Sequence, residues 1–228
     1  AEEIKKRMEA LSPDIVIGMK YLYSNMPYSD VGNYTFDTYL DYVQQGIYLW
    51  ENSPYVKNYP ELYFLNYVLF HRTNDEEIKP CRTYFWKKIK DKVQGKAMVE
   101  AALEINHWCA GEVMYQGTDM RTGSALEIYR SGVGRCGEEA VFVVNVMRSA
   151  GIPARPVYVP RWSHCDDNHA WVEVWCDGDW HYLGACEPEA VLDKGWFTNA
   201  ASRAMMIGSR WYDRAMPDEK VIGKDGMN

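Results

Sequence analysis

The sequence predicts an α+β protein in which a helical region precedes a small antiparallel sheet. From residue 1 to about 112, few apolar-polar alternations occur, and breaks fall at Pro and Asn. Residues 137–151, GEEAVFVVNVMRSAG, are apolar almost all round, and three short strand-like segments follow at 154–160, 169–176 and 180–186. Because these strands lack the repeated strand-helix alternation of a parallel sheet, we expect antiparallel pairing.

The composition is that of an ordinary globular protein. The chain has 228 residues, of which 47% are hydrophobic and 25% charged, so it can bury a real core. The formal charge of -7 argues against attraction to phosphate backbones, and no nucleic-acid partner is expected. No uncharged apolar run is long enough to span a bilayer. A soluble protein is expected, either cytoplasmic or exported with its leader removed.

The helical region is expected to divide from a core domain near residue 95. Residues 96–116 place Met98, Ala101, Ala102, Ile105 and Trp108 on one face, the pattern of a core helix. The predicted organisation is a helical N-terminal region over 1–95, a core over 96–212 and a C-terminal tail over 213–228. The N-terminal helices could form a pro-region, a lid or a substrate-binding wall.

The core elements are bounded by turn residues. The length of the apolar segment 137–151 favours a buried helix, with Gly151 and Pro153 as its stop signal. Asp177-Gly178 lies between the last two strand-like segments and is typical of a hairpin turn. The predicted core therefore packs one buried helix against a three-stranded sheet.

A cysteine stands where this buried helix is predicted to begin. Cys136 lies between Gly134 and Gly137, where unpaired backbone N–H groups and the helix dipole favour negative charge. Such an environment can lower a thiol pKa below about 8.5 and so favour the nucleophilic thiolate. The same N–H groups could hold the oxyanion that forms when sulfur attacks a carbonyl. The sequence therefore predicts a nucleophilic role for Cys136.

A cysteine nucleophile needs a base from elsewhere in the fold. His169 is the strongest of five histidines, since it opens the strand-like segment HAWVEVW and would be held firmly at its first position. Trp171 shares its face by the period of two and could keep water from the imidazole. The orienting carboxylate or amide should come from the hairpin partner, residues 179–189.

These residues resemble the transglutaminase-like superfamily, which includes peptide:N-glycanases and many bacterial members. The resemblance rests on GRCGEEAVFVVNVMRSAGIPAR, on NHAWVEVW, and on a tryptophan-led strand, and it covers roughly residues 96–197. It implies a papain-like fold in which a helix with an N-terminal cysteine packs on an antiparallel sheet. It also implies a Cys-His-acid site, with Cys136 as nucleophile and His169 as general base and acid.

The chain departs from the family pattern at the acid. Alignment of the shared residues puts Gly184 where members commonly have Asp, and glycine cannot orient an imidazole. Glu187 is the nearest carboxylate and is the predicted replacement, although Asp166 or Asp167 could serve instead, or none. Loss of this group lowers a triad's rate greatly but leaves the cysteine-histidine pair.

A second oxyanion donor is expected upstream of the cysteine, as the resemblance implies. Gln116 is the preferred donor and Trp108 the alternative, and Trp171 completes the predicted substrate-binding residues. Cys176 is seven residues from His169 and so faces the other side of its strand, which argues against a zinc cluster there. No metal or cofactor is expected.

The predicted function is cysteine-dependent amide hydrolysis or acyl transfer through a thioester. The expected partners are peptide, protein or glycopeptide substrates. The alternative is a catalytically weak or inactive module of the same fold that binds peptide or glycan, which the glycine at position 184 motivates. A weaker alternative is that the N-terminal helical half is an interaction scaffold and that the thiol site is an inactive remnant.

Overall fold

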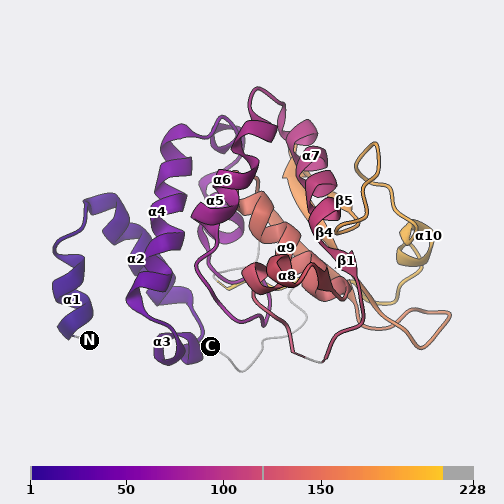
Figure 1. The fold of residues 1–228 in the computed structure, drawn as a ribbon, viewed down its shortest axis with the longest axis horizontal. Coiled ribbons are helices and arrows are strands. Elements are labelled where there is room, and N and C mark those ends of the chain that lie inside the picture. The colour runs from indigo at the N-terminus through magenta and orange to yellow at the C-terminus, as the bar shows by residue number, and fades with distance from the viewer. Residues whose placement is uncertain (1, 120, 213–228) are drawn as a thin grey trace.

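The structure is a computed structural model that describes residues 2–119 and 121–212 (Figure 1). The predicted tail over 213–228 lies outside the described residues. Residues 2–112 are mostly helical, as predicted, with a loop over 70–81, and the helices continue into the second half of the chain. The helices are α1 (Glu2–Met8), α2 (Pro13–Asn25), α3 (Tyr28–Asn33), α4 (Phe36–Asn52), α5 (Glu61–Phe64), α6 (Arg82–Val93), α7 (Met98–Glu112), α8 (Ala125–Ser131), α9 (Cys136–Ser149) and α10 (Thr198–Ala201), with a 3-10 turn η1 (Val56–Asn58) and a π-turn η2 (Leu65–Leu69).

The strands form one antiparallel sheet and one short parallel pair. The sheet has the order β3-β4-β5, with antiparallel pairing throughout, and β1 pairs with β2 in parallel. Asp177 and Gly178 make the tight turn between β4 and β5, both with positive φ, as hairpin turns of this length require. The predicted α+β class and strand arrangement are confirmed. The strands are β1 (Met114–Tyr115), β2 (Val133–Gly134), β3 (Ala154–Val159), β4 (His169–Cys176) and β5 (Asp179–Leu183).

Helix α9 lies at the centre of the molecule. Every side chain from Glu138 to Ser149 is buried, which agrees with a segment that is apolar almost all round. The helix contacts α6, α7 and α8 on one side and β3 and β4 on the other. Figure 1 shows it between the N-terminal helices and the sheet, so α9 joins the two halves of the chain.

The N-terminal helices close the carboxyl end of α9. The side chains of Gln45, Ser53 and Tyr59 donate hydrogen bonds to the last carbonyl groups of the helix and its exit, at 3.2, 3.2 and 2.7 Å. Buried residues of both regions belong to a single hydrophobic cluster. The N-terminal region therefore shares a core with the segment that carries Cys136, and the boundary near residue 95 stays a prediction.

The two faces of the antiparallel sheet pack against different partners. Val172 and Val174 of β4 face α9 and belong to the main core. On the opposite face, Trp171 belongs to a second small cluster with Phe197 from the segment before α10. The chain end then returns to the sheet, because Gly208 exchanges two backbone hydrogen bonds with the β3 edge.

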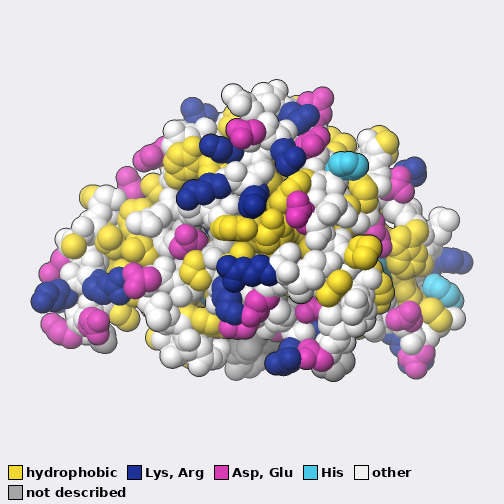
Figure 2. All heavy atoms as spheres, in the orientation of Figure 1, with side chains coloured by type: hydrophobic (Ala, Val, Ile, Leu, Met, Phe, Trp, Pro, Cys, Tyr) yellow, Lys and Arg dark blue, Asp and Glu magenta, His cyan; other side chains and the backbone are white. Residues whose placement is uncertain are grey.

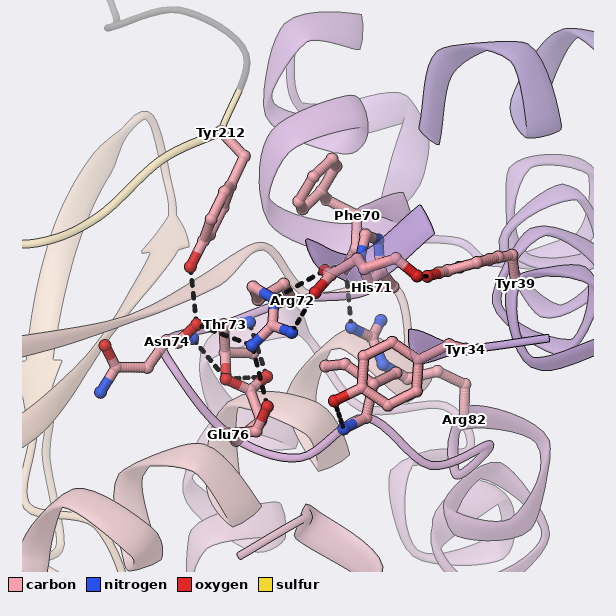
Figure 3. Close-up of polar contacts among 12 residues, drawn as sticks. Tyr34, Tyr39, Phe70, His71, Arg72, Thr73, Asn74, Glu76, Arg82 and Tyr212 are labelled. Carbon is pink, nitrogen blue, oxygen red and sulfur yellow. Dashed lines mark hydrogen bonds and ion pairs between the residues drawn. The ribbon is translucent and has the colours of Figure 1, made fainter. Parts of the chain in front are cut away.

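A buried polar network holds the loop that follows η2 (Figure 3). The guanidinium of Arg72 donates two hydrogen bonds to the Asp30 carboxylate, at 2.6 and 2.8 Å, and Nε2 of His71 lies 2.9 Å from the same carboxylate. The Glu76 carboxylate accepts hydrogen bonds from both the backbone N–H and the hydroxyl of Thr73, each at 2.8 Å. Because buried charges are stable only when paired and hydrogen-bonded, this network specifies one conformation of the loop.

The face drawn in Figure 2 mixes charges of both signs. Basic side chains gather over its middle, acidic side chains are scattered across it, and hydrophobic side chains lie between them. Within residues 2–119 and 121–212, no helix combines the length and apolar character needed to cross a membrane.

Replacing Gly151 by alanine should destabilise the protein more than the same change at Gly178. Both glycines have positive φ, of 85° and 91°, which costs a side-chain residue about 1–2 kcal/mol. A Cβ at position 151 would also lie 2.8 Å from Oγ of Ser53, whereas one at position 178 meets no atom within 4 Å. Urea unfolding should show about 1–3 kcal/mol additional loss for Gly151→Ala. Equal losses would contradict this reading of the helix exit.

Candidate active site

The amino-terminal end of α9 is held by hydrogen bonds from two directions. The Glu138 carboxylate accepts the backbone N–H of Arg135 at 3.1 Å and that of Gly123 at 3.2 Å, so it ties the preceding loop to the first turn. The backbone N–H of Gln116 donates to the carbonyl of Gly134 at 2.9 Å. These hydrogen bonds fix the backbone around Cys136, the first residue of α9. The Cys136 side chain itself is half-buried.

The Cys136 thiol does not have the lowered pKa that the sequence led us to expect. Burial raises the pKa of the Cys136 thiol above its ordinary value. Backbone hydrogen bonds from Ala170 and Gly137 and the charge of Arg135 act in the opposite direction, without outweighing burial, and the charge of Glu139 adds to the rise. The position of Cys136 at a helix terminus does not by itself predict its thiol pKa. The free energy that a thiolate loses when it is removed from water exceeds the stabilisation that the nearby N–H groups provide.

His169 begins β4, as predicted, and its ring lies in an aromatic cage. Ring centroids of four aromatic side chains lie 4.7 to 6.2 Å from that of the imidazole. Nε2 of His169 is buried and has no hydrogen-bond partner within the described residues. Burial lowers the pKa of His169 to about 4, although the charge of Asp167 opposes the shift. The imidazole is thus neutral at pH 7. The cage consists of Trp162, Trp171, Trp196 and Phe197.

The structure brings Glu187 to the place left open by Gly184. A Cβ built on Gly184 would lie 2.3 Å from Oε2 of Glu187, so the carboxylate fills the space of the missing side chain. Both carboxylate oxygens lie 3.0 Å from Nε1 of Trp196, which donates to them. The Trp196 ring in turn packs against His169, with 4.7 Å between centroids. The Glu187 carboxylate therefore contacts His169 only indirectly, by way of the Trp196 ring. Its role as the orienting acid stays a prediction.

The segment that carries Glu187 is fixed from α7. The Asn106 side chain donates to the carbonyl of Gly184 at 2.9 Å and accepts the backbone N–H of Cys186 at 3.0 Å. Cys186 has a φ of 57°, an uncommon conformation for a residue with a side chain. Asn106 therefore holds in place the turn that presents the Glu187 carboxylate.

The three other predicted site residues lie in different parts of the fold. Gln116 is exposed and is joined by its backbone to Gly134, two residues before Cys136. Trp171 is buried beside His169, where it stacks on Phe197 at 5.0 Å. Trp108 of α7 is half-buried, with its ring stacked on Tyr129 of α8 at 5.9 Å and 6.1 Å from the ring of Phe142 in α9. The oxyanion roles of Gln116 and Trp108 stay predictions.

Two residues at the site were not foreseen from the sequence. Trp196 follows no motif, and only the tertiary structure brings its ring against His169. Glu139 lies one turn after Cys136 and is buried. Burial raises the pKa of Glu139 to about 8, and the charges of Glu187 and Glu138 contribute to the rise. The Glu-Glu pair after Gly137 could have signalled a buried carboxyl, since the rest of that helix is apolar.

Comparison with known proteins confirms the family resemblance. Residues 87–185 match the family model described as "Transglutaminase-like superfamily". A solved structure named "Putative Cysteine Protease from Cytophaga hutchinsonii" is 20% identical to this chain, with a TM-score of 0.38. The alignment covers 59% of this chain and 52% of that one, so the chain spans about half that protein's length. A likeness of this degree carries no functional argument. No curated protein matches the chain significantly.

The contact between Gly184 and Glu187 predicts strong coupling in a double-mutant cycle. Gly184→Ala should cost about 1–3 kcal/mol of stability, because its Cβ would overlap the Glu187 carboxylate. Removing that carboxylate in Gly184→Ala/Glu187→Ala should recover part of this loss, because the Cβ that remains at position 187 would still lie 2.8 Å from the added methyl group. Urea unfolding of the four proteins measures the coupling, and Gly117→Ala, where a Cβ meets nothing within 4 Å, is the control. Additivity within about 0.5 kcal/mol would show that the two positions do not share the space.

Proposed function

From the transglutaminase-like core at residues 87–185, we propose that this protein is a cysteine-dependent amide hydrolase or acyl transferase. In this proposal Cys136 is the nucleophile and His169 the general base and acid. The substrate is an amide of a peptide, protein or glycopeptide. Hydrolysis is the favoured outcome, with water accepting the acyl group.

The observation that carries the proposal is the position of the Cys136 sulfur. The thiol interacts with backbone N–H groups of Gly137, at the start of α9, and of Ala170, the residue after His169. The thiol therefore lies where the amino-terminal end of α9 meets the first residues of β4. A thiol at the start of a helix, next to backbone N–H donors, is an arrangement that suits acyl transfer, and the proposal requires the His169 imidazole to reach it from the adjacent residue of β4.

The pKa directions decide how the reaction would begin. Burial raises the thiol pKa of Cys136 and lowers the pKa of His169 to about 4, so the resting pair is a neutral thiol and a neutral imidazole. His169 would accept the thiol proton as sulfur attacks the carbonyl carbon. The oxyanion would form beside the backbone N–H groups of the first turn of α9. Its collapse would expel the amine, which takes the proton from His169 and leaves a thioester.

Hydrolysis of the thioester would repeat these roles. Water attacks the carbonyl carbon as His169 accepts its proton, and collapse of the second oxyanion releases the carboxylic acid and returns the proton to sulfur. Because Nε2 of His169 is sealed among aromatic rings, Nδ1 is the nitrogen assigned to this exchange. Nε2 then carries the other ring proton, for which the described residues offer no hydrogen-bond acceptor.

The same cage supports a second candidate, a catalytically weak or inactive module that binds peptide or glycan. An imidazolium without an acid partner is poorly stabilised, and the loss of a triad acid lowers rates by as much as about 10⁴-fold. The unpartnered Nε2 of His169 and the indole between Glu187 and the imidazole favour this candidate. Turnover separates the two candidates, because both would bind the same ligand.

Turnover should depend on Cys136 and His169 and on no other thiol. A peptide mixture from digested casein, incubated with the protein and read by mass spectrometry, should show new cleavage or deamidation products. Cys136→Ala and His169→Gln should each abolish them, since one removes the nucleophile and the other the base. Cys165→Ala, at an exposed thiol, is the matched control and should retain them. Products that persist in Cys136→Ala, or no products from the intact protein, would refute the enzymatic proposal.

The acid limb of kcat/KM should lie well below that of an ordinary histidine enzyme. The folded-state pKa of His169 is lowered to about 4, so the neutral base persists as pH falls through 6.5 and is lost only near pH 4. The measurement is a pH–rate profile on a cleaved peptide, with circular dichroism to show that the protein is folded at pH 4. A limb centred near pH 6.5 would place the active imidazole outside the aromatic cage.

A further inference from the structure

A pocket of about 380 Å³ lies between the later turns of α4 and α6, in the N-terminal helical region. Its volume falls within the range of small-molecule sites, about 300–1,000 Å³. Ala150, the residue that follows α9, also lines it. Cys136 lies at the other end of α9, about 20 Å away at about 1.5 Å per residue. The pocket is therefore separate from the candidate active site.

Two helix faces form the walls of this pocket. Tyr48 and Asn52 are four residues apart on α4, and Trp86 and Lys90 have the same spacing on α6, so each pair lies on one face of its helix. The two helices lie side by side in Figure 1. The opening between them is thus lined by side chains that both helices present to each other.

Aromatic rings supply the apolar surface of the pocket. The rings of Tyr48 and Trp86 meet at an angle of 54°, with 6.2 Å between centroids. Tyr48 is 43% exposed and Trp86 is half-buried, so the angle between them is open to a ligand. The Tyr55 hydroxyl lies 3.2 and 3.1 Å from the carbonyl oxygens of Val93 and Lys96, which satisfies its polar group. Its buried ring adds apolar surface to the same pocket.

Four exposed polar side chains line the same pocket. Nδ2 of Asn52 donates to the carbonyl of Tyr48 at 2.8 Å, which leaves Oδ1 as an acceptor. The side chains of Lys90, Asp91 and Gln94 make no hydrogen bond or ion pair with other residues across 2–119 and 121–212. An ammonium, a carboxylate and two amides therefore offer both donors and acceptors to a ligand.

The charges of the lining favour a neutral ligand. Lys90 and Asp91 are adjacent and have opposite charges, and the other lining residues are uncharged. An anion would meet the Asp91 carboxylate, and a cation would meet the Lys90 ammonium. A hydrocarbon would cover the rings but would leave the polar groups without partners. The ligand that fits has an apolar face for the rings and several hydroxyl groups for the polar side chains, which is the chemistry of a sugar ring.

We propose that the pocket between α4 and α6 binds a neutral saccharide. A sugar ring packs with its C–H face on Tyr48 and Trp86, and its hydroxyl groups form hydrogen bonds with Asn52, Asp91 and Gln94. The inference does not rest on the proposed function, because the pocket shares no residue with the Cys136 site. The N-terminal helical region then has a binding function of its own.

Saccharide titrations followed by saturation-transfer difference NMR test the proposal. The probes are maltose, cellobiose, lactose and N,N′-diacetylchitobiose, which are all neutral. At least one should give a saturable signal with the intact protein. Tyr48→Ala and Gln94→Ala should each raise its Kd at least about threefold, because one removes an aromatic face and the other a hydrogen-bonding amide. The absence of binding by all four probes would overturn the inference.

Matched variants assign the binding to this pocket. Tyr28→Ala and Gln44→Ala change the same residue types at exposed positions outside the pocket and should leave the Kd unchanged. Cys136→Ala should also bind as the intact protein does. Circular dichroism shows whether each variant is folded. A Kd that survives both Tyr48→Ala and Gln94→Ala would overturn the inference, whatever the outcome for turnover at Cys136.

The preference for a neutral ligand has a test of its own. Glucuronic acid and glucosamine are the anionic and cationic counterparts of glucose at pH 7. Neither should bind more tightly than glucose in the same NMR titration. Tighter binding by either one would overturn the assignment of a neutral saccharide.

Hydrogen exchange of the intact protein locates the ligand without a variant. The saccharide that binds should slow backbone exchange in peptides that cover residues 48–55 and 86–95. Peptides that cover residues 162–171 and 196–198, which carry the aromatic cage of His169, should exchange as in the free protein. Protection confined to the second set would place the saccharide at the candidate active site and overturn the inference.

Discussion

The burial of α9 is the constraint on which the rest of the structure depends. From Glu138 to Ser149 its side chains are enclosed, so the helix needs a layer on each side. The N-terminal helices supply one layer and the antiparallel sheet the other, and three side-chain donors satisfy the last carbonyls. Only the amino-terminal end stays open, and Cys136 stands there half-buried.

The site shows burial prevailing over the local features that favour charge. The helix terminus and the N–H groups of Gly137 and Ala170 oppose the rise in the thiol pKa of Cys136 but do not cancel it. Burial in the aromatic cage lowers the pKa of His169, because the cage disfavours the charged imidazolium. Among the described residues, Nε2 has no hydrogen-bond acceptor. Both partners are therefore neutral at rest, and chemistry at this pair would require proton transfer during the attack.

The Glu187 carboxylate lies beside Gly184, the position at which family members commonly have Asp, and its predicted role as the orienting acid stays a prediction. Gly184 has no side chain, and the Glu187 carboxylate occupies that volume from three residues further along the chain. It meets the indole N–H of Trp196, whose ring packs against His169. An aromatic support of this kind restricts the orientation of the imidazole through packing, whereas a carboxylate would also stabilise its charge.

The sequence by itself determined the α+β class and the approximate positions of α9 and the three strands, because apolar periodicity and glycine turns are local signals. The GRCGEE and NHAWVEVW motifs likewise placed Cys136 and His169 at the starts of their elements. Only the tertiary structure decided the charge state of these two residues, the partners of Glu187 and the pocket between α4 and α6. Burial and contacts between distant segments set those properties, and they depend on how α9, the sheet and the N-terminal helices pack together.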